Sequence, residues 1–188
     1  MCGIIKGVII VSDMTKSLNV KFEQAVSLLI QHMPVSDESS RKPIIFHDIR
    51  VGVYLYNQGY SENIVLAGLL HDTIEWSSAT KEMIEKEFGS LVLKLILANT
   101  KDDSISDKAE KTTELITRCI GVGLEALIIK AADILDSYRW YSSQESIDQL
   151  KYCQRNADAI FKYKPANFND KIFDELNQWR GKYSDLSE

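Results

Sequence analysis

The segment SENIVLAGLLHDTIEW (residues 61–76) says most about how this chain folds. Its middle, Ile64 to Leu70, is apolar at every position. A helix that is apolar all round has to be surrounded by other elements, and Ser61 is a residue type suited to the N-cap. The segment therefore predicts a central, buried helix over 61–75, with a histidine and an aspartate near its end.

Helices are also predicted on both sides of this segment. The chain has only three prolines and nine glycines, so long stretches contain no helix breaker. Polar stretches over 34–42 and 102–110 read as connections, and only 3–11 shows alternation that would suit a strand. The further predicted helices span 17–33, 43–59, 80–89 with Thr80 as N-cap, 90–101, 111–121, 122–141, 142–163 opened by a Ser142–Glu145 capping box, and 167–183. We therefore predict one all-α domain of about eight helices over residues 1–188.

Composition and charge narrow the class of protein. The 188 residues are 45% hydrophobic and 26% charged, as in ordinary globular proteins. A formal net charge of −5 argues against nucleic-acid binding but leaves room for a local cationic pocket. No apolar run reaches about 18 residues, so no membrane partner is expected. Three widely spaced cysteines, Cys2, Cys119 and Cys153, favour a reducing cytoplasm. The oligomeric state is not indicated.

Two histidines and two aspartates occupy positions where a charge would be costly. His47 and His71 are each followed by an aspartate, and His71-Asp72 ends the apolar run. Asp133 follows another apolar stretch in the same way. A buried charge is unfavourable unless it is paired or binds a cation, and imidazole with carboxylate suits Mn, Fe or Zn better than Ca. The alternative is that these are helix-end charges in ordinary ion pairs, and the pattern alone leaves both open.

Helical spacing brings further polar residues into the same region. His71 and Glu75 are four residues apart and share a helix face. Glu75 could then act as a base, or orient a water, beside a metal held by its neighbours. Lys130, Asp133 and Ser137 also share one face.

The order His47, His71-Asp72, Asp133 resembles the H…HD…D signature of the HD-domain metal phosphohydrolases. The segments around these residues are more specific, because they resemble the hydrolase domain of the RelA/SpoT family, which also occurs alone as small alarmone hydrolases. The resemblance covers about residues 20–142, with 143–188 as C-terminal helices. The matching segments are RKPIIFH (41–47), AGLLHDTIEW (67–76), LILANTK (95–101) and ALIIKAADILDSYR (126–139).

This resemblance implies the all-α HD-domain helical bundle and a specific reaction. One divalent metal ion, usually Mn, would bind His47, His71, Asp72 and Asp133. Glu75 would position or activate the attacking water. The reaction would remove the 3′-pyrophosphate of guanosine tetra- or pentaphosphate. The residues expected to contact this small phosphorylated nucleotide are Arg41, Lys42, Ser137 and Arg139.

The chain departs from the family pattern on the substrate side. Trp76 follows Glu75 where the family has aspartate, and Asp48 follows His47 where the family has proline. Ile44 replaces an aromatic residue, and Ser137 replaces asparagine. All four metal ligands are retained. Two alternatives therefore remain beside the alarmone hydrolase: an HD phosphohydrolase acting on another nucleotide phosphate, and a nucleotide-binding regulatory module with low activity.

Overall fold

The computed structural model describes the backbone of residues 4–186 and the side chains of residues 17–186. Over that range the chain is all-α, as predicted, and contains no strand. None of the described helices is both long and apolar enough to cross a membrane. The elements are α1 (Ile4–His32), α2 (Ile44–Asn57), α3 (Glu62–Leu69), α4 (Thr73–Trp76), α5 (Lys81–Phe88), α6 (Ser90–Asn99), α7 (Lys108–Val122), α8 (Leu124–Ser143), α9 (Ile147–Tyr163), α10 (Lys171–Lys182) and the 3₁₀ helix η1 (Ser184–Leu186).

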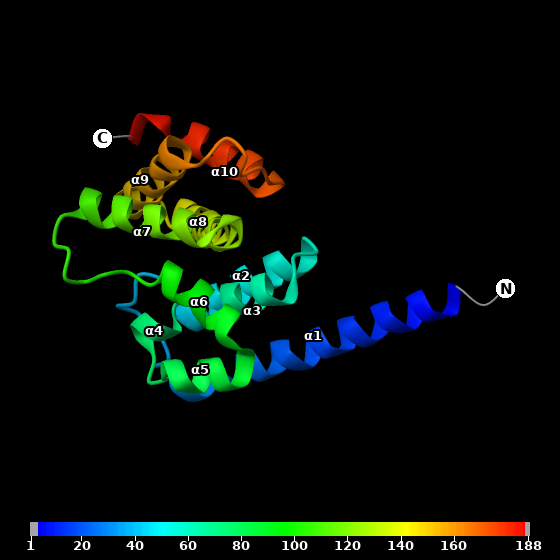
Figure 1. Ribbon diagram of the computed structural model, residues 1–188. Coiled ribbons are helices and arrows are strands. Elements are labelled where there is room, and N and C mark those ends of the chain that lie inside the picture. Colours follow the sequence, from blue (N-terminus) through cyan, green and yellow to red (C-terminus); the bar gives the residue numbers. More distant parts are fainter. Residues whose placement is uncertain (1–3, 187–188) are drawn as a thin grey trace.

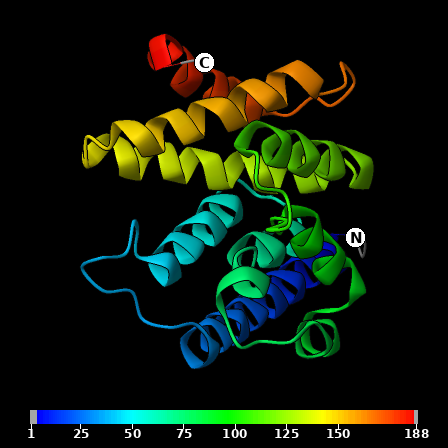
Figure 2. The ribbon, with the colours of Figure 1, turned by 90° about the vertical axis from the view of Figure 1, so that its left-hand side faces the viewer.

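Helix α8 is the centre of the bundle. It packs against α2, α3 and α6 on one side and against α7, α9 and α10 on the other. Figure 2 shows these two groups as layers, with α1–α6 below and α7–α10 above. The N-terminal part of α1 extends away from both layers (Figure 1). Any group placed midway along α8 is therefore enclosed by helices from both layers.

Close packing of α2 against α3 depends on two glycines. A Cβ atom on Gly68 would lie 2.2 Å from Cδ1 of Leu55, and one on Gly52 would lie 2.9 Å from Cβ of Leu69. Residues Ile64–Leu69 are all buried, which confirms the prediction of a buried central helix. The short distance between the two helices places the first turn of α2 beside the end of α3.

The predicted helix over 61–75 is interrupted. Helix α3 ends at Leu69, and a turn over 70–72 precedes the single-turn helix α4. The Thr73 side chain donates a hydrogen bond of 2.6 Å to the carbonyl oxygen of Leu70, which stabilises the turn. The interruption directs His71 and Asp72 away from the axis of α3.

Two other local predictions were wrong. The strand-like segment 3–11 is helical from Ile4 onward; its apolar residues at 4, 5, 8 and 9 also fit helical spacing, and no proline separates it from the following helix. The Ser142–Glu145 capping box does not form, because α8 continues through Ser143 and Glu145 adopts a φ of 52°. Thr80 does cap α5, accepting a hydrogen bond from the backbone N–H of Met83.

Candidate metal centre

Three helices bring the four predicted metal ligands together. His47 lies in the first turn of α2, His71 and Asp72 follow the end of α3, and Asp133 lies midway along α8. All four are buried, with between 0% and 7% of their surface exposed. Such burial of two carboxylates requires a compensating positive charge.

The donor atoms of these residues converge on one point. Nε2 of His47 lies 3.3 Å from Nε2 of His71 and 3.2 Å from Oδ1 of Asp133. Nε2 of His71 lies 3.6 Å from Oδ1 of Asp72 and 3.7 Å from Oδ1 of Asp133. Ligands about 2.1 Å from one ion lie about 3.0–3.4 Å apart. The arrangement therefore fits a single divalent ion.

Both imidazole rings are oriented through their other nitrogen. Nδ1 of His71 donates to the carbonyl oxygen of Gly68 at 2.8 Å, and Nδ1 of His47 donates to Oδ2 of Asp136 at 2.6 Å. A proton on Nδ1 leaves the Nε2 lone pair available to a metal. In both rings Nε2 is the atom that faces the centre.

Arg50 and Asp136 support His47, and neither was singled out from the sequence. Arg50 binds Asp136 with two hydrogen bonds of 2.7 Å, and its guanidinium carbon lies 4.9 Å from the centroid of the Phe46 ring. Burial would raise the pKa of Asp136, but the hydrogen bonds from His47 and Arg50 outweigh it and lower the pKa to about 2. Both residues lie three positions after a predicted ligand, and that helical spacing is the signal that could have identified them.

Two lysines balance the carboxylate of Asp133. Nζ of Lys130, a buried residue, donates to Oδ2 of Asp133 at 2.8 Å, and Nζ of Lys42 lies 3.7 Å from Oδ1. Ser137 donates to Oδ1 at 3.4 Å, so the predicted shared face of Lys130, Asp133 and Ser137 is confirmed. Burial would raise the pKa of Asp133, but the lysine charges hold it well below its ordinary value.

The pKa of His71 shows that the carboxylates around it favour a positive charge at the centre. Burial would lower its pKa, but the carboxylates of Asp72 and Asp48 outweigh burial and raise the pKa to about 10. The carboxylates that favour a proton on this ring would equally favour a divalent cation. Imidazole nitrogen and carboxylate oxygen together suit a transition metal.

Asp48 is a further carboxylate beside these ligands. One donor atom each from His47, Asp48, His71 and Asp72 lie within 4.8 Å of one another. Oδ1 of Asp48, however, lies 3.5 Å from Nδ1 of His71, on the side of the ring that faces away from the centre. Oδ1 of Asp133 faces Nε2 of both histidines, so Asp133 is better placed than Asp48 to be a direct ligand.

A cavity of about 570 Å³ opens on the centre. Its wall includes the predicted ligands Asp72 and Asp133 and four residues predicted to bind substrate or take part in catalysis: Arg41, Lys42, Ser137 and Glu75. Trp76, Tyr141, Tyr152, Lys101 and Lys111 also line it. A neighbouring cavity of about 520 Å³ shares part of this wall and adds the cationic residues Lys108, Lys151 and Arg155. Together the two cavities are lined by seven basic and five acidic side chains, and the excess of basic side chains lies in the second cavity.

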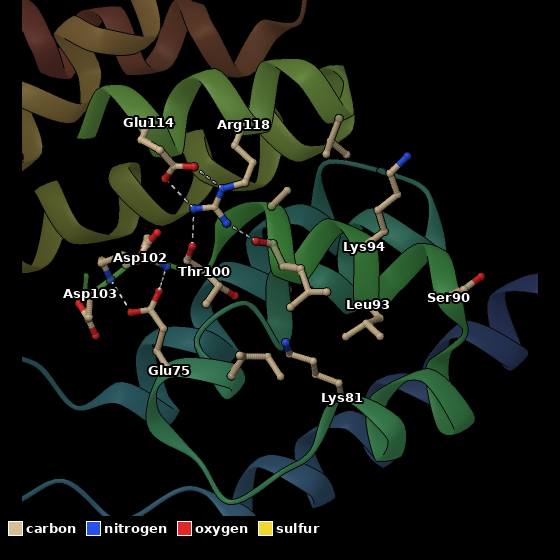
Figure 3. Close-up of a pocket in the computed structure, with 15 residues that line it drawn as sticks. Glu75, Lys81, Ser90, Leu93, Lys94, Thr100, Asp102, Asp103, Glu114 and Arg118 are labelled. Atoms are coloured by element: carbon tan, nitrogen blue, oxygen red, sulfur yellow. Dashed lines mark hydrogen bonds and ion pairs between the residues drawn. The ribbon is translucent and has the colours of Figure 1, made fainter. Parts of the chain in front are cut away.

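Glu75 lies at the edge of this cavity and is held by Lys101. Its carboxylate accepts hydrogen bonds from the backbone N–H of Lys101 at 2.6 Å and from Nζ at 2.8 Å. Both residues also line a larger cavity of about 860 Å³, shown in Figure 3. There the Arg118 side chain is turned toward Glu114 and Thr100, and none of the four metal ligands contributes to the wall. The candidate site is therefore the smaller cavity.

Among the residues predicted to contact the substrate, Arg139 alone lies away from the site. Its guanidinium pairs with Glu175 and lies 5.2 Å from the centroid of the Tyr54 ring. It is absent from the described residues that line the cavities around the centre. A substrate contact through Arg139 has no support in this arrangement.

A buried centre of two histidines and two aspartates inside a helical bundle is an arrangement typical of metal-binding domains. The chain belongs to the HD-domain family, whose sequence profile matches residues 25–163. This confirms the fold and the family that the sequence predicted.

Curated relatives and a solved structure agree with this family. The chain is 34% identical to guanosine-3′,5′-bis(diphosphate) 3′-pyrophosphohydrolase MESH1 of Drosophila melanogaster over 150 residues, which are 74% of this chain and 82% of that protein. It is 24% identical to guanosine-3′,5′-bis(diphosphate) 3′-pyrophosphohydrolase of Aquifex aeolicus over 90% of this chain, but spans only 27% of that longer protein. A structure described as a metazoan ortholog of SpoT that hydrolyzes ppGpp superposes with a TM-score of 0.64 at 28% identity, covering 86% of this chain and 96% of that one.

Proposed function

We propose that this protein is a metal-dependent nucleotide phosphohydrolase that removes the 3′-pyrophosphate of guanosine tetra- or pentaphosphate. The observation that carries the proposal is the convergence of two Nε2 atoms and the Asp133 carboxylate, within 3.7 Å, at a cavity lined by cationic side chains. The names of the relatives with 34% and 24% identity support this choice of substrate.

The ligands proposed for the metal are His47, His71, Asp72 and Asp133, and Mn is the ion we propose. An ion at this position would lower the pKa of a water molecule bound to it and would shield negative charge on the phosphoryl oxygens of the substrate. The protein supplies the fixed positions: each imidazole is held through Nδ1, and Asp133 is held by Lys130.

We propose that the nucleotide binds to the basic side chains that line the two cavities. Lys42 reaches the floor of the cavity, where Nζ donates to the Ser137 hydroxyl at 3.3 Å. Arg41 lines both this cavity and its neighbour, so it can contact phosphates farther from the centre. A chain with a net charge of −5 repels a polyanion at long range, and these local charges offset that repulsion.

Glu75 is proposed to orient the attacking water. The two hydrogen bonds from Lys101 fix its carboxylate at the edge of the cavity, three residues after the ligand Asp72. Lys101 is also cationic and lines the same wall, so a bound phosphate and Glu75 would share this lysine.

We also propose a cytoplasmic location. The two cysteines of the described region, Cys119 and Cys153, are buried free thiols. Burial raises the pKa of Cys119 to about 12, so this thiol stays protonated and unreactive. Buried thiols of this kind are typical of proteins that work in a reducing compartment.

The direct test is product analysis. Purified protein with Mn should convert guanosine tetraphosphate into equal amounts of GDP and pyrophosphate, separated by anion-exchange chromatography. GTP, which lacks a 3′-phosphate, is the matched control and should remain intact. Release of orthophosphate from other nucleotides would favour the second phosphohydrolase, and tight binding without any product would favour a regulatory binding module.

Trp76 favours a second candidate substrate. Its side chain is 43% exposed and lines the cavity, at the position where the family motif has an acid. An exposed aromatic ring offers a stacking surface, whereas an aspartate could accept a proton. The exchange suits hydrolysis of a different nucleotide phosphate at the same metal centre.

Restoring the acid tests the contribution of Trp76. Trp76→Asp is expected to raise kcat for guanosine tetraphosphate by about tenfold or more, because a positioned carboxylate contributes to proton transfer. The measurement is steady-state pyrophosphate release at saturating Mn. Trp76→Phe keeps the aromatic ring and should show no gain. An unchanged kcat in Trp76→Asp would show that the missing acid does not limit the reaction.

A further inference from the structure

Asp48 is a buried carboxylate that no protein group satisfies. It is 0% exposed, and neither of its oxygens accepts a hydrogen bond from any residue in the described part of the chain. Its nearest charged neighbour is Nδ1 of His71, at 3.5 Å. A carboxylate in such surroundings is costly to keep unless a cation compensates it.

A comparison with Asp136 shows that Asp48 lacks a hydrogen-bond donor. Each histidine of the centre has a carboxylate next to its Nδ1 atom: Asp136 beside His47 at 2.6 Å and Asp48 beside His71 at 3.5 Å. Asp136 is fully paired, because Arg50 donates two further hydrogen bonds to it. Asp48 has no such partner, and the Nδ1 proton of His71 already bonds to the carbonyl oxygen of Gly68.

The position of Asp48 places its charge close to the proposed metal ligands. Donor atoms of His47, Asp48, His71 and Asp72 lie within 4.8 Å of one another. An electrostatic attraction over that distance is strong in a buried, low-dielectric environment. The charge of Asp48 therefore acts across the His71 ring on a divalent ion bound at Nε2 of the two histidines.

We propose that Asp48 belongs to the metal centre as a supporting carboxylate behind His71, and that the bound divalent cation stabilises its charge in place of the hydrogen bonds that the described part of the protein does not provide. Asp48 thus acts as a positioning residue through its charge beside the His71 ring, and not through a hydrogen bond to Nδ1, whose proton bonds to Gly68. The inference rests on the metal-binding part of the proposed function and is independent of the nucleotide.

The test compares metal affinity with the stability of the metal-free protein. Asp48→Asn keeps the shape of the side chain and removes its charge. The dissociation constant for Mn, measured by isothermal titration calorimetry on metal-stripped protein, should rise about tenfold or more. The Tm of the metal-free protein should stay the same or rise by a few degrees, because Asp48 accepts no hydrogen bond that the substitution could break.

Asp136→Asn is the matched control. It also weakens Mn binding, but it lowers the Tm of the metal-free protein, because it breaks the pair with Arg50. If Asp48→Asn lowers the metal-free Tm in the same way and leaves the dissociation constant unchanged, Asp48 is a structural residue and the proposal is overturned. Asp48→Ala is the second variant. If both variants unfold in the absence of metal, Asp48 is likewise a structural residue and the proposal is overturned.

The readouts separate this inference from the proposed function. A wild-type protein that binds Mn while Asp48→Asn binds it equally well contradicts only the role of Asp48. A wild-type protein that binds no Mn contradicts both the metal centre and this inference. Pyrophosphate release enters neither measurement, so a different nucleotide substrate would leave the result unchanged.

Discussion

His71→Ala is expected to abolish Mn binding and to lower kcat/KM by about a thousandfold or more, equivalent to ~4 kcal/mol of transition-state stabilisation. The substitution removes the Nε2 atom that faces His47, Asp72 and Asp133 within 3.7 Å. Metal content of the purified variant and steady-state release of pyrophosphate provide the two measurements.

The third histidine of the chain provides the control. His32 lies at the end of α1, where Nδ1 is 3.0 Å from the Ser78 hydroxyl, and it contributes to none of the cavities around the centre. His32→Ala should therefore retain one Mn per chain and full activity. Stoichiometric Mn in His71→Ala, with activity close to wild type, would show that the metal lies elsewhere.

Asp133→Ala is expected to remove the metal and also to destabilise the metal-free fold by about 3–5 kcal/mol. The reason is Lys130, which is 2% exposed and donates to Asp133 at 2.8 Å. Burial alone would lower the pKa of Lys130, but the Asp133 carboxylate outweighs burial and holds the pKa above its ordinary value. Without Asp133 this cation is buried with no counter-charge. The free energy of unfolding in urea, measured on metal-stripped protein, provides the test.

A double variant separates the two effects. Asp133→Ala combined with Lys130→Met removes both charges, so most of the lost stability should return while Mn binding stays absent. Asp174→Ala, an exposed aspartate on α10, should change neither stability nor metal binding. Equal destabilisation in the single and double variants would mean that the Lys130–Asp133 pair is not the source of the loss.

Much of the fold and centre could be predicted because burial and residue type are visible in the chain. An all-round apolar run identified the central helix, and the motif order picked out four side chains, up to 86 residues apart, that the fold brings together as candidate ligands. The interruption after Leu69 could not be predicted, since the apolar run continues across it to Leu70. Arg139 could have been excluded by geometry, because it lies two residues after Ser137 and therefore points to a different side of α8.

Contacts between side chains of different helices could not be predicted from the sequence. Arg50 and Asp136 are 86 positions apart, and only the packing of α2 on α8 shows that they meet. Asp48 likewise looked like the second half of another HD pair. Its isolation from hydrogen-bond donors became visible only with the surrounding helices in place.

The single turn of α4 separates a buried position from an exposed one. Asp72 precedes this turn and is buried at the metal centre, while Trp76 ends it with 43% of its surface exposed in the cavity. On the proposed function, a substitution at the outer end would alter which nucleotide is selected without moving the proposed ligands, which α2, α3 and α8 hold in place.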